Sequence, residues 1–232
     1  MVILAGGLAT RLYPATKTLP KSLIELAGKP FIHHQLELLR EKGIKRVVLC
    51  VGYLGEMIQE YVGDGSRWGL EVQYSYDGNV LLGTGGAVKK ALYLLPDTFF
   101  ILYGDSFLDI NYTMVIERFY DEGLPVLMTI FRNQNAFDLS NILMKEGRIL
   151  KYDKKSRDPA MDYIDYGLIV MRRRIFEGCP SDKPFELSQF LYQMVDQGQV
   201  AAFEVERRFY EIGSTQGVLE TEEYIRNRTL SS

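Results

Sequence analysis

The chain has 232 residues, of which 27 are Lys or Arg and 30 are Asp or Glu, so the formal net charge is −3 (27 − 30). This near balance argues against a broad basic surface for nucleic acid or an anionic membrane, while a small local phosphate site is still compatible with it. No uninterrupted apolar run approaches the roughly 20 residues of a membrane-spanning helix. Two cysteines, Cys50 and Cys179, are too few for a disulfide framework or a zinc cluster, so we expect a protein of the reducing cytoplasm.

Short, continuous apolar runs in the first half of the chain predict strands that are covered on both faces. They are residues 2–5, 47–51 and 99–103, and a glycine follows each run directly. Between them, helices are predicted at residues 30–42, 55–62 and 86–95. Strands that alternate with helices are typical of a doubly wound sheet, so the first half predicts βαβ units.

The second half of the chain predicts more strands than helices. Strands are expected at residues 125–131, 142–144, 164–171, 201–206 and 208–212, with residues 147–152 as the return arm of a hairpin. Helices are expected at residues 184–197 and 215–228. Since no linker, repeat or low-complexity segment separates the two halves, we predict one domain over residues 1–232.

A glycine-rich segment follows the first predicted strand directly and reads GGLATRLYPATKTLPK over residues 6–21. Glycines allow close approach of a ligand to the backbone, and successive N–H groups form a nest for anions. Arg11 and Lys21 add a planar guanidinium and a mobile point charge. The spacing fits neither the dinucleotide-binding nor the Walker pattern, and a tight turn with two solvated cations is the structural alternative.

This segment closely resembles the signature of the sugar-1-phosphate nucleotidylyltransferases, G-G-x-G-T-R-L-x-P-x-T followed by P-K, although Ala9 stands where the family has glycine. Other positions agree in order up to about residue 217. They are the loop LGTGGA at residues 82–87, Asp105 after the third apolar run, the pair Asp153-Lys154, the DYG element at residues 165–167 and the YEIGS element at residues 210–214. Asp165 and Glu211 stand where the family more often has asparagine and aspartate.

The resemblance implies an α/β fold, a Rossmann-like three-layer sandwich with a mainly parallel central sheet and a smaller mixed or antiparallel sugar-binding portion. It also implies transfer of a nucleotidyl group from an NTP to a sugar 1-phosphate, with release of pyrophosphate and dependence on Mg²⁺. The loops look most like those of relatives that make GDP-mannose-type or GDP-heptose-type sugars, which favours GTP over UTP or CTP. The expected partners are these small molecules rather than nucleic acid or a membrane, and homo-oligomerisation is left open.

The resemblance also assigns roles to residues of this sequence. Arg11 would hold the β- and γ-phosphates, Lys21 would bridge the α-phosphate and the sugar phosphate, and Asp105 with Glu211 would hold the metal. The nucleotide would contact Leu4, Ala5, Gly6, Gly7, Thr10, Gly83, Thr84, Gly85 and Gly86, and the sugar phosphate would contact Asp153, Lys154, Asp165 and Gly167. Catalysis would then depend on positioning and electrostatics, with no side chain as nucleophile.

Each of these side chains has a structural alternative. Asp105 is compatible with an Asx turn, Glu211 with a paired carboxylate, and Lys154 with a solvated charged face. The departures at Ala9, Asp165 and Glu211 leave open a regulatory homologue that binds a nucleotide sugar without turnover. A dinucleotide-dependent oxidoreductase is disfavoured because the first loop lacks the required glycine spacing.

Overall fold

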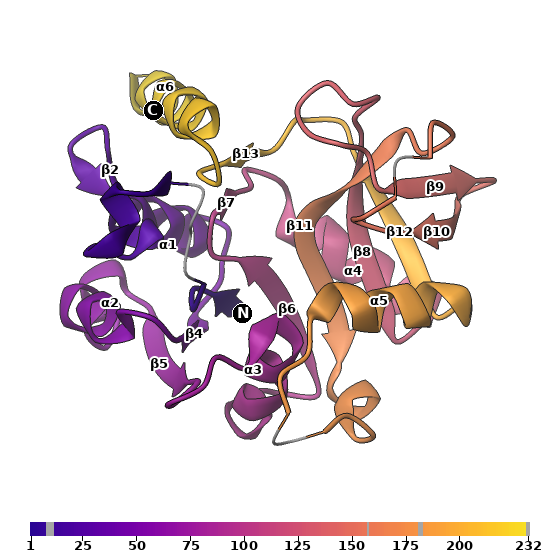
Figure 1. Ribbon diagram of the computed structural model, residues 1–232, viewed down its shortest axis with the longest axis horizontal. Coiled ribbons are helices and arrows are strands. Elements are labelled where there is room, and N and C mark those ends of the chain that lie inside the picture. The colour runs from indigo at the N-terminus through magenta and orange to yellow at the C-terminus, as the bar shows by residue number, and fades with distance from the viewer. Residues whose placement is uncertain (8–11, 157, 181–182, 231–232) are drawn as a thin grey trace. The chain divides into compact units, whose positions relative to one another are not determined.

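The computed structural model describes residues 1–7, 12–156, 158–180 and 183–230 (Figure 1). The chain divides into two compact units. The first consists of Met1–Leu81, Tyr103–Asp109 and Phe209–Ser232, and the second of Leu82–Leu102 and Ile110–Arg208. The prediction of a single domain over residues 1–232 is not tested by this division and stays a prediction.

The first unit contains three parallel strands in the order β5-β4-β1. The strands are β1 (Val2–Leu4), β4 (Arg46–Val51) and β5 (Glu71–Tyr76), and the α-helices are α1 (Phe31–Glu41), α2 (Gly55–Val62) and α6 (Thr215–Leu230). Two short antiparallel pairs complete it: β2 (Glu25–Leu26) with β3 (Lys29–Pro30), and β7 (Ser106–Phe107) with β13 (Tyr210–Glu211). Three 3₁₀ turns lie at Ala15–Lys17, Lys21–Leu23 and Ser66–Trp68.

A cluster of buried apolar side chains ties the last helix of the chain to the first one. It comprises Leu26, Phe31, Leu38, Phe107, Ile212 and Ile225, which come from segments far apart in the sequence. The rings of Phe31 and Phe107 meet edge to face at 6.5 Å. This core therefore fixes the short pair β7–β13 between α1 and α6, and that pair carries two of the predicted site carboxylates at its end.

The second unit is built on a mixed sheet in the order β6-β11-β8-β12-β10-β9. Its strands are β6 (Thr98–Tyr103), β8 (Val126–Arg132), β9 (Ile142–Lys145), β10 (Arg148–Tyr152), β11 (Tyr163–Arg172) and β12 (Val200–Val205). Its helices are α3 (Gly83–Ala91), α4 (Tyr112–Glu122) and α5 (Leu187–Asp196), with 3₁₀ turns at Leu92–Leu94 and Arg173–Phe176. The strand β12 runs parallel to β8, whereas β11 runs antiparallel to β6 and β8.

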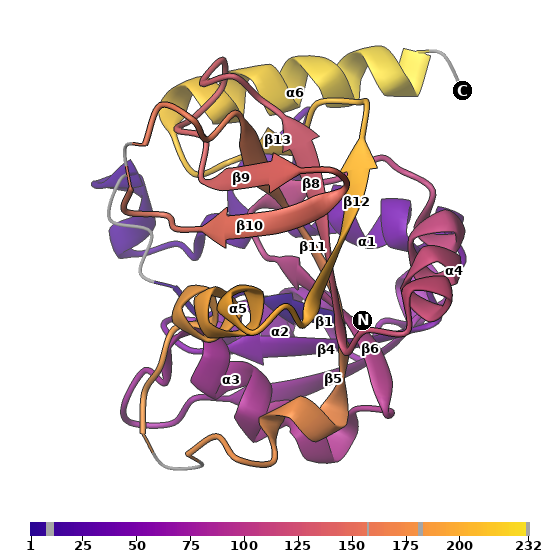
Figure 2. The ribbon, with the colours of Figure 1, turned by 90° about the vertical axis from the view of Figure 1, so that its right-hand side faces the viewer.

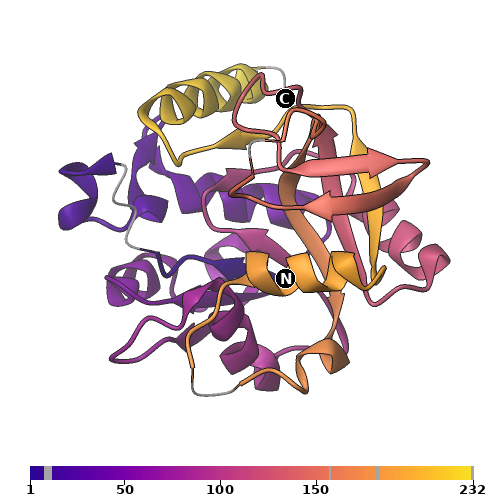
Figure 3. The ribbon, with the colours of Figure 1, turned by 45° about the vertical axis from the view of Figure 1, so that its right-hand side comes forward.

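The predicted hairpin is confirmed as the antiparallel pair β9–β10, whose two arrows point in opposite directions in Figure 2 and are seen from another angle in Figure 3. The predicted strand at residues 164–171 is found as β11, which is buried along almost its whole length. The other predicted strands and helices are also found, with ends that differ by a few residues.

Among the elements of the described residues that were not predicted, β5 and α4 are the longest; the short strands β2, β3 and β7 were not predicted either. The side chains of β5 are alternately exposed and covered at most positions, and this strand lies at the end of the order β5-β4-β1, so it lacks the continuous apolar run of a central strand. Helix α4 carries a clear signal in hindsight, since the Asn111 carboxamide accepts from the N–H groups of Thr113 and Met114. Among the described residues, no helix combines the length and the apolar character needed to cross a bilayer.

Candidate active site

Glycines bring the ends of the two parallel strands β1 and β4 close together. A Cβ on Gly6 would lie 3.0 Å from the nitrogen of Gly52, and a Cβ on Gly52 would lie 2.9 Å from the carbonyl oxygen of Gly6. The N–H of Ala5 donates to the carbonyl of Cys50 at 2.8 Å. These contacts explain why each apolar run ends at a glycine, and they fix where the glycine-rich segment leaves the sheet.

Of the predicted residues in the first loop, Leu4, Ala5, Gly6 and Gly7 are described. Arg11 and Thr10, together with Ala9 at the position where the family has glycine, lie outside the described residues, so their predicted roles stay predictions.

A second close contact at the end of β1 positions Asp105. The N–H of Gly104 donates to the carbonyl of Leu4 at 3.0 Å, and a Cβ on Gly104 would lie 2.4 Å from that same oxygen. Only glycine tolerates this approach without a shift of backbone. Sequence reasoning placed Asp105 at a strand end but did not identify the steric requirement at Gly104.

The side chains of Lys21 and Asp105 form an ion pair, with Nζ and Oδ2 2.7 Å apart. Lys21 begins a 3₁₀ turn after Pro20, whose extended backbone precedes that turn. The exposed fractions of the two side chains are 21% and 32%, so both are partly accessible to a ligand. The structure therefore brings two predicted site residues together that are 84 positions apart in the sequence.

Glu211 turns its carboxylate back onto the loop that follows β13. The N–H of Gly213 donates to Oε2, and the hydroxyl of Ser214 donates to Oε1 at 3.4 Å. A Cβ on Gly213 would lie 2.2 Å from Oε2 of Glu211 and 3.6 Å from Oδ2 of Asp105, so this glycine lies against both carboxylates. Burial, and then the negative charge of Asp105, raises the pKa of Glu211 above its ordinary value.

The pair Asp105 and Glu211 has the donor chemistry of a site for a hard divalent cation. Both ligands are carboxylates, and their mutual repulsion is the kind that a bound cation relieves. Within the described ranges, no group of three or more His, Cys, Asp or Glu side chains forms a metal site. Mg²⁺ commonly uses one or two protein carboxylates and takes its remaining ligands from water and phosphate oxygens, so two carboxylates fit this ion.

In the second unit, helix α3 begins inside the glycine-rich loop at Gly83, three residues before the predicted start. Gly83 has a φ of +71°, a backbone conformation that suits glycine. The N–H groups of Gly85 and Gly86 both donate to the carbonyl of Phe185, and a Cβ on Gly85 would lie 2.3 Å from the Phe185 ring. Packing against residue 185 is thus one reason for a glycine at position 85.

The hydroxyl of Thr84 links this loop to the start of helix α5. It donates to Oε2 of Glu186 at 2.8 Å and accepts from the N–H of Leu187 at 2.8 Å. Glu186 was not among the predicted site residues. Nothing in the local sequence pattern indicates a partner 102 positions away, so the structure was needed to find it.

Two of the predicted sugar-phosphate residues, Lys154 and Gly167, contact the buried carboxylate of a third, Asp165. The Asp165 side chain is 1% exposed, and its Oδ2 lies 3.0 Å from Nζ of Lys154. It also accepts from the hydroxyl of Tyr152 at 3.2 Å and, through Oδ1, from the N–H of Gly167 at 3.0 Å. Lys154 therefore does not belong simply to a solvated charged face, because it forms an ion pair with a buried carboxylate.

Gly167 and Asp153 differ in their relation to this carboxylate. Gly167 has a φ of +99° and lies where the register between β11 and β8 shifts, so its backbone bends β11 at the carboxylate. Asp153 instead accepts from the N–H of Lys155 at 2.8 Å, within its own turn.

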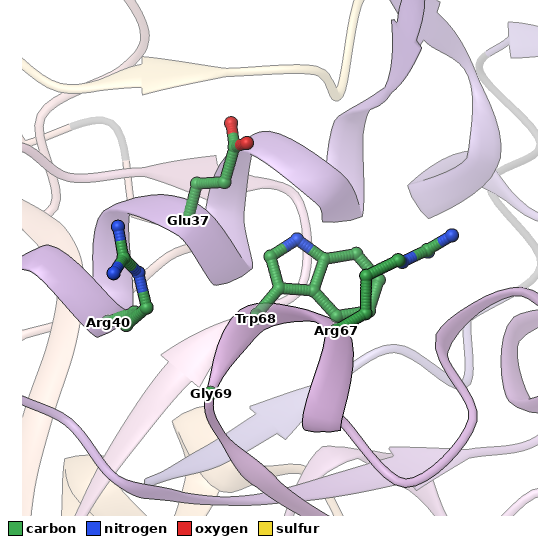
Figure 4. A pocket seen from close by; sticks show the side chains of 5 residues that line it. All are labelled: Glu37, Arg40, Arg67, Trp68 and Gly69. Carbon is green, nitrogen blue, oxygen red and sulfur yellow. The ribbon is translucent and has the colours of Figure 1, made fainter.

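A separate hollow of about 570 Å³ in the first unit is lined by Glu37, Arg40, Arg67, Trp68 and Gly69; these lining residues are labelled in Figure 4. The guanidinium of Arg67 stacks over the Trp68 ring at 4.0 Å. His33 binds Oε1 of Glu37 at 2.9 Å and meets the Trp68 ring edge to face at 5.3 Å. These groups partner one another, and the hollow contains none of the predicted site residues.

Comparisons with known proteins agree with this arrangement. The family model described as "Nucleotidyl transferase" matches residues 1–228. A UTP–glucose-1-phosphate uridylyltransferase of Synechocystis sp. is 30% identical over 217 residues, which are 85% of this chain and 55% of the relative. A D-glycero-alpha-D-manno-heptose 1-phosphate guanylyltransferase of Campylobacter jejuni is 27% identical over 212 residues, which are 91% of this chain and 93% of the relative.

The solved structure of HddC from Yersinia pseudotuberculosis, complexed with GMP-PN, superimposes with a TM-score of 0.82 at 26% identity, over 97% of this chain and 98% of that one. The Rossmann-like α/β fold is thereby confirmed. The chain spans about half the length of the Synechocystis relative but nearly all of the Campylobacter one. By its family match and by these relatives, the chain belongs to the nucleotidyl transferase family, among the sugar-1-phosphate nucleotidylyltransferases.

Proposed function

We propose that this chain catalyses nucleotidyl transfer from an NTP to a sugar 1-phosphate. A phosphate oxygen of the sugar 1-phosphate attacks the α-phosphorus, the bond from that phosphorus to the β-phosphate oxygen breaks, and pyrophosphate leaves with the bonding electrons. The observation that carries the proposal is the ion pair of Lys21 with Asp105 next to the carboxylate of Glu211. The NTP and the sugar 1-phosphate are both polyanions, so the reaction requires positive charge at the site. A lysine and two carboxylates that could hold a divalent cation would supply it.

The roles of the side chains follow from their charge and placement. Asp105 and Glu211 would hold Mg²⁺, which supplies positive charge to neutralise the phosphates when it is bound. Lys21, held at Asp105 and partly exposed, would bind oxygens of the α-phosphate and of the sugar phosphate. Arg11 would bind the β- and γ-phosphates and stabilise the leaving pyrophosphate.

The nucleotide would bind at both glycine-rich loops. We propose backbone contacts from Leu4, Ala5, Gly6, Gly7 and Thr10 and from the loop at residues 83–86. Because the N–H groups of Gly85 and Gly86 donate to Phe185, the start of helix α3 at Gly83 and Thr84 offers the better contacts with the base.

The sugar phosphate would bind near Lys154, Asp165 and Gly167, with Asp153 on the same loop as Lys154. A lysine paired with a buried carboxylate has a defined position, which suits recognition of a phosphate group.

We propose GTP as the nucleotide and the cytoplasm as the location. The Campylobacter relative, whose length matches this chain, is named a guanylyltransferase, and the solved HddC structure contains GMP-PN. The Synechocystis relative is named a uridylyltransferase, so UTP is the first alternative.

The experiment is a matrix of pyrophosphate release with GTP, UTP, CTP, dTTP and ATP against a panel of sugar 1-phosphates, in the presence of Mg²⁺. We expect turnover with at least one pair and the highest kcat/KM with GTP. Lys21→Ala and Asp105→Ala should lower kcat by about a hundredfold or more, as removal of one preorganised charge does elsewhere. Nucleotide binding by calorimetry with no pyrophosphate from any pair would instead identify a regulatory homologue.

A further inference from the structure

A buried glutamine of helix α1 binds the backbone on both sides of Asp105. Gln35 is 1% exposed, and its Nε2 donates to the carbonyl of Ser106 at 2.8 Å and to that of Tyr103 at 3.4 Å. These two carbonyls flank Gly104 and Asp105, so one side chain spans the turn that presents the carboxylate. Both α1 and β7, which are labelled in Figure 1, belong to the first unit.

The orientation of this amide is determined by its surroundings. Oε1 of Gln35 is buried and has no hydrogen-bond partner among the described residues. If the amide were rotated by 180°, Oε1 would instead face the carbonyl oxygens of Tyr103 and Ser106, and two acceptors would be opposed. Both N–H groups are therefore used on the turn, although the oxygen is left without a partner.

The remaining contacts of the turn hold it from two other directions. On one side, the N–H of Gly104 donates to Leu4 at the end of β1. On the other side, the N–H of Ile212 donates to the carbonyl of Asp105 at 2.9 Å, and Ser106 is the register partner of Glu211. Gln35 supplies the third anchor, because its Nε2 is the group that binds the carbonyls on either side of residues 104 and 105.

We propose that Gln35 is a positioning residue for the divalent-cation site, acting through the backbone of residues 103–106 on the carboxylate of Asp105 and, across the β7–β13 pair, on Glu211. The inference rests on the proposed function. Burial of a partly unsatisfied amide in an apolar helix face costs folding free energy. The two hydrogen bonds that the Gln35 amide donates to the turn are therefore best explained by a role at the site.

The test uses Gln35→Met, which keeps the length and approximate volume of the side chain but removes both donors. The matched control is His34→Leu on the same helix, since the His34 ring binds the carbonyl of Leu26 at 2.7 Å and not the turn. Two quantities are measured for the whole chain: amide hydrogen exchange of residues 103–107, and the Mg²⁺ concentration that gives half-maximal pyrophosphate release.

We expect Gln35→Met to speed exchange at residues 103–107 and to raise the half-maximal Mg²⁺ concentration by about tenfold to a hundredfold, as loss of an outer partner of a metal ligand does. His34→Leu should change neither quantity. Any lowering of kcat by Gln35→Met should disappear in an Asp105→Asn background, because the two changes act through one group. If Gln35→Met does not fold, Gln35→Asn, whose amide is one methylene too short to reach Ser106, takes its place.

The inference is overturned if exchange at residues 103–107 is unchanged or if the Mg²⁺ dependence matches that of the wild type. An effect on kcat that adds fully to that of Asp105→Asn also contradicts it. Failure of the proposed function is a separate result, since the wild-type chain itself would then release no pyrophosphate. The exchange measurement needs no turnover and reports on the turn in either case.

Discussion

At the scale of single residues, glycines determine where the site carboxylates lie. The carboxylate of Glu211 has one methylene more than the aspartate usual in the family, and it folds back toward the N–H of Gly213. The first turn of α6 lies against it as well at Gly217, where a Cβ would lie 2.5 Å from Oε1. The space for this longer side chain is thus provided by two neighbours without a Cβ, Gly213 and Gly217.

We predict that Gly213→Ala lowers activity more than stability. The added Cβ would displace the end of the Glu211 side chain and press toward Asp105, while the backbone at residue 213 has no left-handed conformation to lose. We expect kcat to fall about tenfold or more and the melting temperature to change little. Gly178→Ala is the control, because a Cβ there meets nothing within 4 Å. Wild-type turnover by Gly213→Ala would contradict the assignment of Glu211.

The pair Lys154 and Asp165 allows a second prediction. Lys154→Met leaves the buried carboxylate of Asp165 without its cation, so we expect a loss of about 1–3 kcal/mol in the free energy of unfolding. The double variant Lys154→Met/Asp165→Asn should recover most of that loss, since a neutral amide needs no counter-charge. Urea unfolding of the single and double variants measures the coupling. Strictly additive losses would show that the two side chains act independently.

At the scale of elements, sequence patterns were sufficient to predict a strand or a helix where the physical signal lies within the segment itself. The continuous apolar run at residues 47–51 predicted β4, which is covered along almost its whole length. Edge strand β5 was not predicted because exposed positions interrupt its apolar pattern. The start of α3 was misplaced because the first turn of that helix is mostly glycine, and its contacts come from Phe185, about 100 residues away.

The same division holds for the site. The sequence motifs of the loops indicated Lys21, Asp105 and Glu211, because these motifs follow one another in the order that the family shows. The contribution of Gln35 could not be predicted, since a glutamine in an amphipathic helix reads as a surface residue until the turn packed against it is known. Glu186 was equally hidden.

Helix α6 is anchored to α1 through Asp109, which is a separate feature at this scale. The carboxylate of Asp109 forms an ion pair with Nζ of Lys42. It also accepts hydrogen bonds from the hydroxyl of Tyr224 and from Nε of Arg228, both at 3.1 Å. Burial works against its ionisation, but Lys42, and then Tyr224 and Arg228, outweigh burial and lower the pKa of Asp109 below its ordinary 3.8. Glu41 holds Arg228 in place.

We predict that Asp109→Asn destabilises the protein at neutral pH and has little effect in acid. A carboxyl group with a lowered pKa in the folded state stabilises that state above its unfolded pKa, and this stabilisation is lost as the pH falls through the folded value. At pH 7 we expect a loss of about 1–2 kcal/mol, or roughly 2–8 °C in melting temperature. The difference from the wild type should shrink below about pH 4, where the wild-type carboxylate also begins to protonate.

Thermal melts of wild type and Asp109→Asn between pH 3 and pH 8 measure this prediction. Asp121→Asn serves as the control, because Asp121 is an exposed carboxylate of α4. A stability difference between Asp109→Asn and the wild type that stays constant over the whole pH range would contradict an electrostatic anchor.

At the scale of the whole molecule, the net charge of −3 conceals a local concentration of both signs. Of the cations that we propose for phosphate binding, the two lysines within the described residues are each paired with a carboxylate: Lys21 with Asp105, and Lys154 with Asp165. A protein with nearly equal numbers of acidic and basic residues attracts polyanions only weakly at a distance. We therefore expect its affinity for a nucleotide to come from contacts within the site and from a bound cation.

The proposed dependence on a cation leads to the last prediction. A nucleotide that binds the folded chain at about 100 times its dissociation constant stabilises it by about 2.7 kcal/mol, which raises the melting temperature by roughly 5–10 °C for a chain of this size. With GTP and Mg²⁺ we expect a shift of this order. With GTP and EDTA the phosphates would face the carboxylates of Asp105 and Glu211 without a cation between them, and the shift should largely disappear. Lys21→Ala should reduce the shift even with Mg²⁺, whereas Asp121→Asn should not. Equal shifts with and without the chelator would contradict the assignment of Asp105 and Glu211 as the cation site.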